Sequence, residues 1–236
     1  MASCCPNDPT KESLVSSEIV PDFYILLTVQ LADATQKMNS HEQLQVWLDS
    51  DAPELEAAVV ADIQRIVRGL QSSGDTFYGY AVLPGDYITQ PNPASHVVAF
   101  NRESDLAVSH SEEPYYRYCV CEWQNYVHNG FNDSNSILES QLRTFKERHS
   151  RAEGSYQLDE HEIAYVAKIN RAILVALVAL KQNGSFDDGT YMIIWYSDSD
   201  AEIMNQSAKT LNSARITKII LPSSHSRSRF PLIPND

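Results

Sequence analysis

The strongest structural signal in the chain lies in residues 158–184, which read LDEHEIAYVAKINRAILVALVALKQNG. Asp159 and Glu162 have the spacing of a capping box, in which the first residue caps a helix and the second reaches back to it. Apolar residues then recur every three or four positions and, in the second half, surround the helix on all sides. Asn183 and Gly184 form a stop signal. We therefore expect a long helix at the centre of the core.

Strands are predicted on both sides of this helix in the sequence. The continuous apolar run YMIIWY at residues 191–196 is typical of a central strand that is covered on both faces. The other candidates are rich in aromatic and β-branched residues and are flanked by turn residues. They are residues 77–83, 97–100, 115–120 and 216–221.

Further helices are predicted from apolar residues at three- and four-residue spacing. They cover residues 21–38, 51–70, 132–149 and 203–211, and a short helix is expected around residues 104–108. For residues 21–38 a strand is the alternative, because of the Tyr24-Ile25 and Thr28-Val29 pairs. Asp51 and Glu54 are spaced as a second capping box, at the start of the helix predicted for residues 51–70.

Helices and strands are interspersed without the regular alternation of a doubly wound sheet. The expected fold is therefore α+β (or α/β), a single mixed sheet of about four to five strands with helices packed against it. We expect a flexible tail at residues 1–18, a single globular domain at residues 19–221 and a C-terminal tail at residues 222–236.

The chain of 236 residues is acidic, with 18 Lys and Arg against 31 Asp and Glu and a net charge of −13. This balance disfavours binding to nucleic acid, which needs clustered basic residues, and to an anionic membrane. Apolar runs fall short of the ~20 residues of a membrane span, and the first residues do not form a signal peptide, so we expect a cytoplasmic protein. The acidic surface either serves solubility alone or fits a basic protein partner.

Sequence motifs for nucleotide binding, hydrolase nucleophiles and zinc proteases are missing from the chain. The histidines are isolated, and the cysteines form two close pairs, Cys4 with Cys5 and Cys119 with Cys121, without the spacing of a zinc site. We therefore predict no cofactor, no metal site and no catalytic residue, and we expect the thiols to stay reduced. His161, which lies between two glutamates, is expected to be a solvated residue of the first helical turn.

An aromatic segment is the first candidate binding site, because residues 115–126 read YYRYCVCEWQNY. Arg, Tyr and Trp are enriched at binding hot spots, since they bury a large area and keep a polar group. The candidate binding residues are Tyr116, Arg117, Tyr118, Glu122 and Trp123. The alternative is that these aromatic residues belong to the core or to a sheet edge.

A second candidate site follows the strand predicted at residues 191–196, where residues 197–200 read SDSD. Ligands of open α/β sheets bind beyond the carboxyl ends of the strands. Asp198 and Asp200 are therefore candidates for cation binding or for acid–base chemistry. A loop with helix-capping residues would explain the same letters.

Several of these segments together resemble the bacterial domain of unknown function 4303. The resemblance covers roughly residues 20–215. It is carried by the aromatic segment 77–83, ESDL at residues 103–106, Tyr116-Arg-Tyr118 with Glu122-Trp123, NSIL at residues 135–138, and the helix 163–180 with the strand after it. The family has no established activity, so the resemblance implies no catalytic residue. Its members often lie beside toxin and immunity genes, which implies that some are immunity proteins or other protein-binding modules.

Three classes of function are compatible with these features. A protein-binding module of the immunity type accounts for the acidic charge, the aromatic segment and the missing catalytic motifs, and it is the hypothesis that we favour. An enzyme would require Arg117, Glu122 and Asp198 to converge in one pocket. A structural or scaffold protein would form a homo-oligomer through residues 115–126, although the sequence does not predict the oligomeric state.

Overall fold

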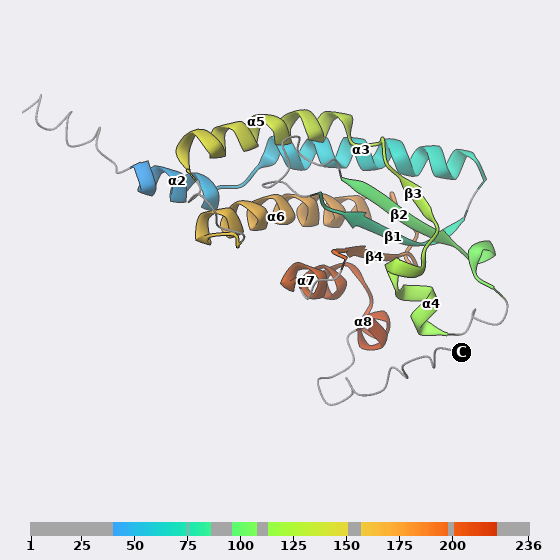
Figure 1. Cartoon of the computed structure of the whole chain (residues 1–236). Coiled ribbons are helices and arrows are strands. Elements are labelled where there is room, and N and C mark those ends of the chain that lie inside the picture. The colour runs from blue at the N-terminus through green and yellow to red at the C-terminus, as the bar shows by residue number, and fades with distance from the viewer. Residues whose placement is uncertain are drawn as a thin grey trace, which may run out of the picture. The chain divides into compact units, whose positions relative to one another are not determined.

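The computed structural model describes residues 40–74, 76–85, 96–107, 113–150, 157–197 and 201–220. Their elements are shown in Figure 1 and follow in this order: α2 (Ser40–Asp49), α3 (Pro53–Ser72), β1 (Phe77–Leu83), β2 (Val97–Arg102), η1 (Glu103–Asp105), α4 (Pro114–Tyr118), η3 (Val120–Glu122), β3 (Asn125–Val127), α5 (Asn132–Arg148), α6 (Glu160–Gln182), β4 (Tyr191–Ile194), α7 (Glu202–Leu211) and α8 (Ala214–Ile220). The chain divides into two compact units between Gln43 and Leu44, and the fold below is that of the second unit. The helix predicted at residues 21–38, both predicted tails and Asp198 lie outside the described residues.

In the described part of the chain, four strands form one mixed sheet in the order β3-β2-β1-β4. β1 pairs antiparallel with β2 and parallel with β4, and β2 pairs antiparallel with β3. The α+β class with a single mixed sheet is therefore confirmed. The strands predicted at residues 77–83, 97–100 and 191–196 are also confirmed, and the last of them ends at Ile194.

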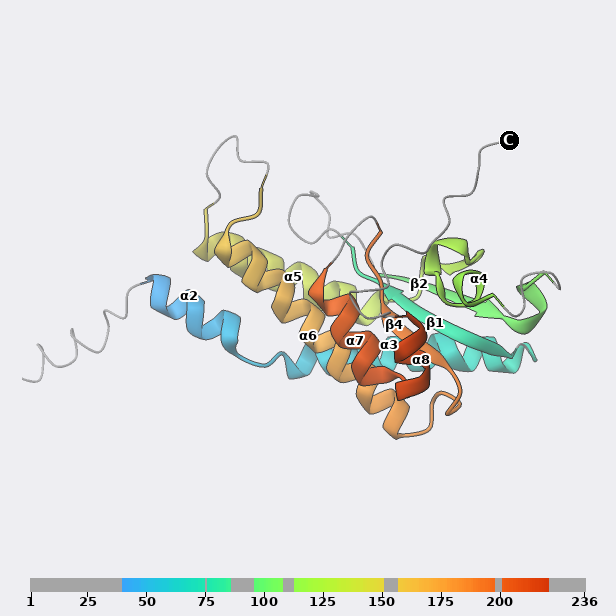
Figure 2. The same ribbon diagram turned by 90° about the horizontal axis from the view of Figure 1, so that it is seen from below.

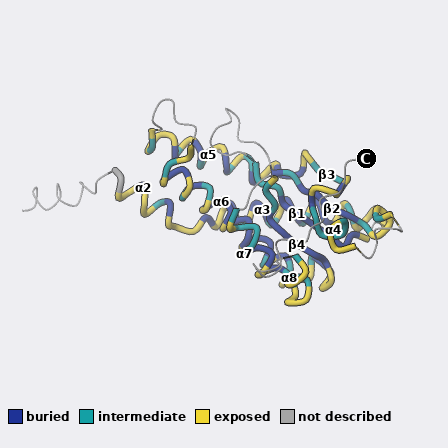
Figure 3. Tube along the Cα trace, turned by 60° about the horizontal axis from the view of Figure 1, so that its bottom comes forward, coloured by how far each residue is buried: buried dark blue, intermediate teal, exposed yellow. Residues whose placement is uncertain are grey.

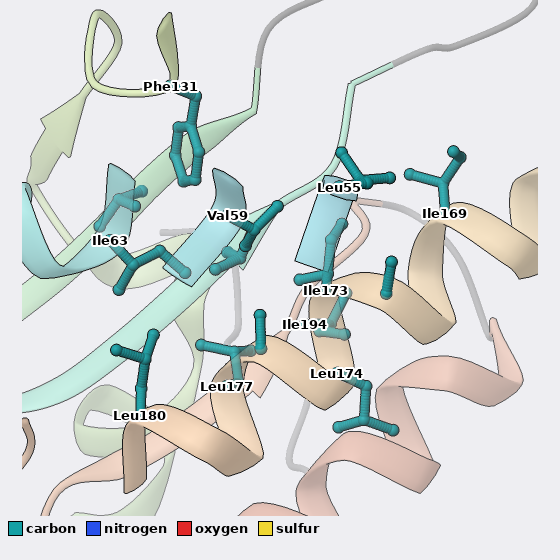
Figure 4. Packing of buried hydrophobic residues seen from close by; sticks show 14 of the residues in the cluster. Leu55, Val59, Ile63, Phe131, Ile169, Ile173, Leu174, Leu177, Leu180 and Ile194 are labelled. Carbon is teal, nitrogen blue, oxygen red and sulfur yellow. The ribbon is translucent and has the colours of Figure 1, made fainter. Parts of the chain in front are cut away.

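α6 lies at the centre of the core, as its sequence predicts. The Asp159 carboxylate accepts hydrogen bonds from the amides of His161 and Glu162, and the Glu162 carboxylate accepts one from the amide of Asp159, so the capping box is confirmed. Apolar side chains of α3, α5 and α6 pack together and against one face of the sheet. Figure 4 shows part of this packing, with Leu55, Val59, Ile63, Phe131, Ile169, Ile173, Leu177 and Ile194 among its members.

By length and composition α6 could cross a membrane, because an 18-residue window of it has a mean hydropathy of 1.8. Within the protein, however, 56% of that window is buried. α6 packs against α3, α7 and β4, and apolar side chains that face these neighbours account for much of this composition.

α3 begins differently from the prediction. Its N-cap is Ala52, whose side chain makes no capping hydrogen bond, and Pro53 stands in the first turn. Proline suits this position because an amide there would have no partner within the helix. The helix itself is confirmed, but the capping box predicted from Asp51 and Glu54 is wrong.

The outer edge of β4 is covered by α7 and the residues that follow it. The amide of Met192 donates to Asn212 Oδ1 at 2.9 Å, and the amide of Ile194 donates to Ser207 Oγ at 3.0 Å. Side chains thus satisfy the amides to which a further strand would bind, and the sheet ends at β4.

Two segments that were predicted as strands are helical. Residues 216–221 fall mainly in α8, which Figure 2 shows together with α7 in front of β4; Ile216 and Ile220, one turn apart, pack against the sheet. Residues 115–120 form α4 and the start of η3, where Pro114 begins a helical turn and the Cys119 amide donates to the Tyr115 carbonyl. Short apolar runs do not distinguish a strand from a turn of helix.

A second, smaller core lies on the sheet face opposite α3 and α6. Strands β1, β2 and β4 contribute Ala81, Ala99 and Ile193 to this second core. The side chains of Val120 and Trp123 cover them. Small side chains on this face allow the segment that carries α4 and η3 to approach the sheet closely. The fold thereby places the aromatic segment of the sequence directly against β1 and β2.

Candidate functional site

The tyrosines of α4 are divided between core and solvent. α4 is a single short turn, so its consecutive side chains point in different directions. Tyr115 is 41% exposed, whereas Tyr116, Arg117 and Tyr118 are half-buried. Figure 3 shows intermediate and exposed positions along the segment of α4. The rings of Tyr115 and Tyr116 meet edge to face at 5.3 Å.

Arg117 is held on both sides. Its Nη1 donates to Glu103 Oε2 at 3.0 Å and its Nη2 donates to Glu103 Oε1, a two-pronged contact. The guanidinium also lies 4.2 Å from the ring centre of Tyr78. The hydrogen bonds between the pair raise the pKa of Arg117 and lower the pKa of Glu103. Both groups therefore keep their charges around neutral pH.

A bulge in β1 creates the support for this arginine. The register between β1 and β2 shifts between Phe77 and Gly79. As a result, the Phe77 side chain packs with Tyr80 in the main core. Tyr78 and Gly79 instead both contact the segment that carries α4 and η3, through Arg117 and Trp123. The Tyr78 hydroxyl accepts a hydrogen bond from Asn101 Nδ2 at 2.9 Å, and burial raises the pKa of Tyr78 to about 12. The phenol beneath Arg117 is therefore neutral and fixed.

Trp123 anchors the segment to the sheet. It is 2% exposed, and its Nε1 donates to the Arg117 carbonyl at 3.3 Å. Its ring covers Gly79, where an added Cβ would lie 2.6 Å from Trp123 Cζ2. Tyr191 of β4 packs edge-on against both Trp123 and Tyr118, at 6.0 and 5.2 Å. Trp123 therefore supports the site from within the core, and Tyr118 lies between core and surface.

Glu122 is exposed and accepts a hydrogen bond from the Tyr115 hydroxyl at 3.0 Å, which raises the pKa of Tyr115. Between these residues a disulfide bond joins Cys119 and Cys121, so the expectation of reduced thiols is wrong for this pair. The bond closes the short turn that links α4 to η3. Both elements are consequently fixed relative to each other.

β3 and η1 complete the same surface. Asn125 Nδ2 donates to Asp105 Oδ2 at 2.7 Å, which ties β3 to η1, just as Arg117 ties α4 to η1. Tyr126 is 39% exposed and stacks on His128 at 6.0 Å. Because Tyr126 is paired with Ala99, it points to the sheet face on which Trp123 lies. We call the side chains of Tyr115, Tyr116, Arg117, Glu122 and Tyr126 the aromatic surface.

Acidic groups dominate the surroundings of the aromatic surface. Glu103, Asp105, Glu113 and Glu122 are exposed there, whereas the basic residues of the same elements are Arg102 and Arg117. Arg117 is already paired with Glu103. The remaining field is therefore negative.

Both residues of the second predicted site, Asp198 and Asp200, fall in the segment 198–200, which the structure does not describe. β4 ends before this segment at Ile194, which is paired with Val82. Since β1 and β4 are parallel, Val82 lies at the opposite end of β1 from Tyr78, the residue on which Arg117 rests. Arg117 and Glu122 also have different partners, Glu103 and Tyr115 respectively.

Sequence reasoning missed the residues that hold the aromatic surface in place. Tyr78, Asn101 and Glu103 lie in two strands and a turn that precede it, and their role depends on pairing between distant segments. One signal was available: a glycine inside an aromatic strand, here Gly79, often marks a bulge or a close contact.

The protein is thus an α+β domain in which the short helix α4 packs on a mixed sheet and exposes tyrosine side chains to solvent. The sequence model of a domain of unknown function, DUF4303, matches residues 55–213, which is more than half of the chain, and the protein belongs to this family. The resemblance seen in the sequence is thereby confirmed. No curated protein and no solved structure matches the chain.

Proposed function

We propose that this protein is a protein-binding module of the immunity type, and that the aromatic surface is its interface. The observation that carries the proposal is the pair of partly exposed tyrosines, Tyr115 and Tyr126, on a surface whose charged groups are already held in place. Tyrosine contributes strongly to protein interfaces because a rigid apolar ring carries a hydroxyl that can bind a partner.

Preorganisation supports this assignment. Binding costs free energy when side chains and loops must first be ordered. Here Trp123 fixes the segment on Gly79, the Glu103 carboxylate holds Arg117, and a disulfide bond closes the turn at Cys119. A partner would meet a surface that is already shaped.

The charge of the surface favours a basic partner. Acidic residues outnumber basic ones around the tyrosines, and the whole chain carries a net charge of −13. Opposite charges on two proteins speed their encounter and disfavour partners of the same sign. A basic protein, such as a cationic toxin, fits this surface.

The test begins with retention of a partner from a lysate of the native host, identified by mass spectrometry. The purified partner is then titrated calorimetrically with the wild type, with a Tyr115→Ala/Tyr126→Ala variant, and with Val46→Ala as a control. Val46 lies on α2, outside the aromatic surface, and is 62% exposed. We expect the double variant to bind at least ~10-fold more weakly, the control to match the wild type, and added salt to weaken binding.

Three results would contradict the proposal. They are equal affinity of the wild type and the double variant, a partner that is acidic, and the retention of no protein at all. Light scattering adds a further check, because self-association that the Tyr115→Ala/Tyr126→Ala variant abolishes would support the homo-oligomer hypothesis instead.

A further inference from the structure

The junction between α5 and α6 brings together three side chains that can bind a metal ion. His149 directly follows the last residue of α5, Asp159 is the N-cap of α6, and Glu162 lies in its first turn. One ligand atom of each residue lies within 4.8 Å of the other two. The aromatic surface takes no part in this cluster.

The capping box orients both carboxylates of the cluster. Asp159 Oδ1 accepts the amides of His161 and Glu162 at 3.0 Å each, and Glu162 Oε2 accepts the amide of Asp159 at 3.0 Å. Because Oδ1 is occupied in this way, Asp159 Oδ2 turns to His149 Nε2, at 2.8 Å. Backbone contacts therefore hold both carboxylates close to the His149 imidazole.

Neighbouring rings fix the imidazole. The His149 ring packs against Phe145 at 5.1 Å and against His161, edge to face, at 5.3 Å. His161 was expected to be solvated, but it is 9% exposed. His149 thus has little freedom to turn away from the carboxylates.

Burial makes the cluster different from an ordinary acidic surface. Glu162 is 2% exposed, although a first-turn glutamate is normally solvated, whereas the Asp159 side chain is 40% exposed. One imidazole nitrogen and two carboxylates that lie this close together form a donor set that one divalent cation can share. The exposed Asp159 provides an entry path for the ion.

We propose that His149 Nε2, Asp159 Oδ2 and the Glu162 carboxylate bind a divalent transition-metal ion. One imidazole nitrogen and two carboxylates suit zinc better than magnesium or calcium, which prefer oxygen ligands alone. Three protein ligands leave a further position for water. The bound ion connects the end of α5 to the start of α6 and stabilises this junction.

The sequence did not predict this site because His149 and Asp159 are ten positions apart and belong to different helices. The spacing matches none of the short metal-binding patterns. The ligands meet only when α5 and α6 come together.

The test is calorimetric titration of the oxidised full-length protein with zinc chloride, together with its thermal unfolding with and without zinc. The key variant is Glu162→Gln, because glutamine also serves in a capping box but is a poor metal ligand. Glu139→Gln, an exposed position of α5, is the matched control. His149→Gln is a second ligand variant in case Glu162→Gln does not fold, which circular dichroism would show.

We expect the wild type and Glu139→Gln to bind one zinc ion and to unfold at a higher temperature in its presence. Each ligand variant is expected to bind zinc at least ~10-fold more weakly and to lose the thermal shift. Absence of zinc binding by the wild type would overturn the proposal, and so would equal affinity of the wild type and the ligand variants.

Discussion

The carboxylate of Asp62, on α3, accepts hydrogen bonds from both the amide and the hydroxyl of Ser134, in the first turn of α5. The distances from Asp62 Oδ2 are 2.9 Å to the amide nitrogen and 2.7 Å to Ser134 Oγ. The N-cap residue of α5, Phe131, has no side chain that can cap the helix. A buried acid from a neighbouring helix therefore takes over the role of the N-cap.

This relationship predicts that Asp62→Ala is strongly destabilising. The substitution leaves the first-turn amide and the buried hydroxyl of Ser134 without an acceptor, and both are costly to bury unpaired. We expect the free energy of unfolding to fall by about 3 kcal/mol, measured by urea denaturation.

The control is Asp133→Ala. Asp133 pairs with Arg65 at 2.6 Å, but its side chain is 59% exposed, so its loss should cost less than ~1 kcal/mol. If Asp133→Ala proved as destabilising as Asp62→Ala, the exposed ion pairs of Arg65 and not the buried cap would hold the two helices together.

Gly79→Ala tests the contact beneath the aromatic surface. The new Cβ would lie 2.6 Å from Trp123 Cζ2, closer than such atoms approach in proteins, so the indole must move. We expect a loss of about 2 kcal/mol in the free energy of unfolding and weaker partner binding. Measurements by urea denaturation and calorimetry check the two effects.

Gly69→Ala is the matched control for Gly79→Ala. Gly69 lies within α3 with open space around it, and alanine there should stabilise the protein by up to ~1 kcal/mol. A second comparison adds Trp123→Leu to Gly79→Ala, which should remove most of the cost of the clash. If the losses in the free energy of unfolding from Gly79→Ala and Trp123→Leu simply added in the double variant, the two residues would not be in contact.

The long helix was predictable because its signals are local. The capping box of Asp159 and Glu162 and the spacing of the apolar residues act within one helix, and α6 confirms them. The same holds for the strand at Tyr191–Ile194, whose apolar side chains fit burial on both faces. These signals lie within one helix or one strand, so they can be recognised without knowing which other segments pack against it.

The predictions were wrong or incomplete where contacts with residues distant in the sequence determine the local structure. Residues 216–221 have strand composition, but side chains of Ser207 and Asn212 already bind the edge of β4 to which a further strand would pair. Of the aromatic residues that the sequence offered as a binding site, Trp123 is buried in the core. The sequence also did not predict that Glu103 pairs with Arg117. Neither fact follows from local spacing.

Lys168→Met probes the end of α2. Lys168 is 2% exposed, and its Nζ donates to the carbonyls of Trp47, Ser50 and Asp51, so it caps the C-terminal end of that helix from α6. Methionine keeps the volume but leaves these carbonyls unsatisfied. We expect a loss of about 2 kcal/mol in the free energy of unfolding and faster amide exchange in α2.

Lys209→Met serves as the control for Lys168→Met, because Lys209 is exposed in the last turn of α7. Its substitution should change the free energy of unfolding by less than ~0.5 kcal/mol. Similar losses for both variants would show that the capping contacts of Lys168 add little to stability.

His96 predicts how stability depends on pH. It is fully buried beside Phe131, and burial lowers its pKa from 6.5 to about 4. Below pH 6.5 the unfolded chain binds a proton at this residue while the folded chain does not, so acid favours unfolding. His96 contributes about 3 kcal/mol to the free energy of unfolding at pH values above 6.5, its pKa in the unfolded chain. This contribution is lost as the pH falls towards about 4, its pKa in the folded chain.

The measurement is the free energy of unfolding between pH 7 and pH 5, a window above the range in which most carboxylates titrate. His96→Gln should flatten this dependence, because glutamine does not titrate, whereas His128→Gln, at an exposed position, should leave the slope unchanged. The slope, and not the absolute stability, is the informative quantity, since His96→Gln also alters packing against Phe131. If His96→Gln and the wild type lost stability equally between these two pH values, burial would not lower the pKa of His96.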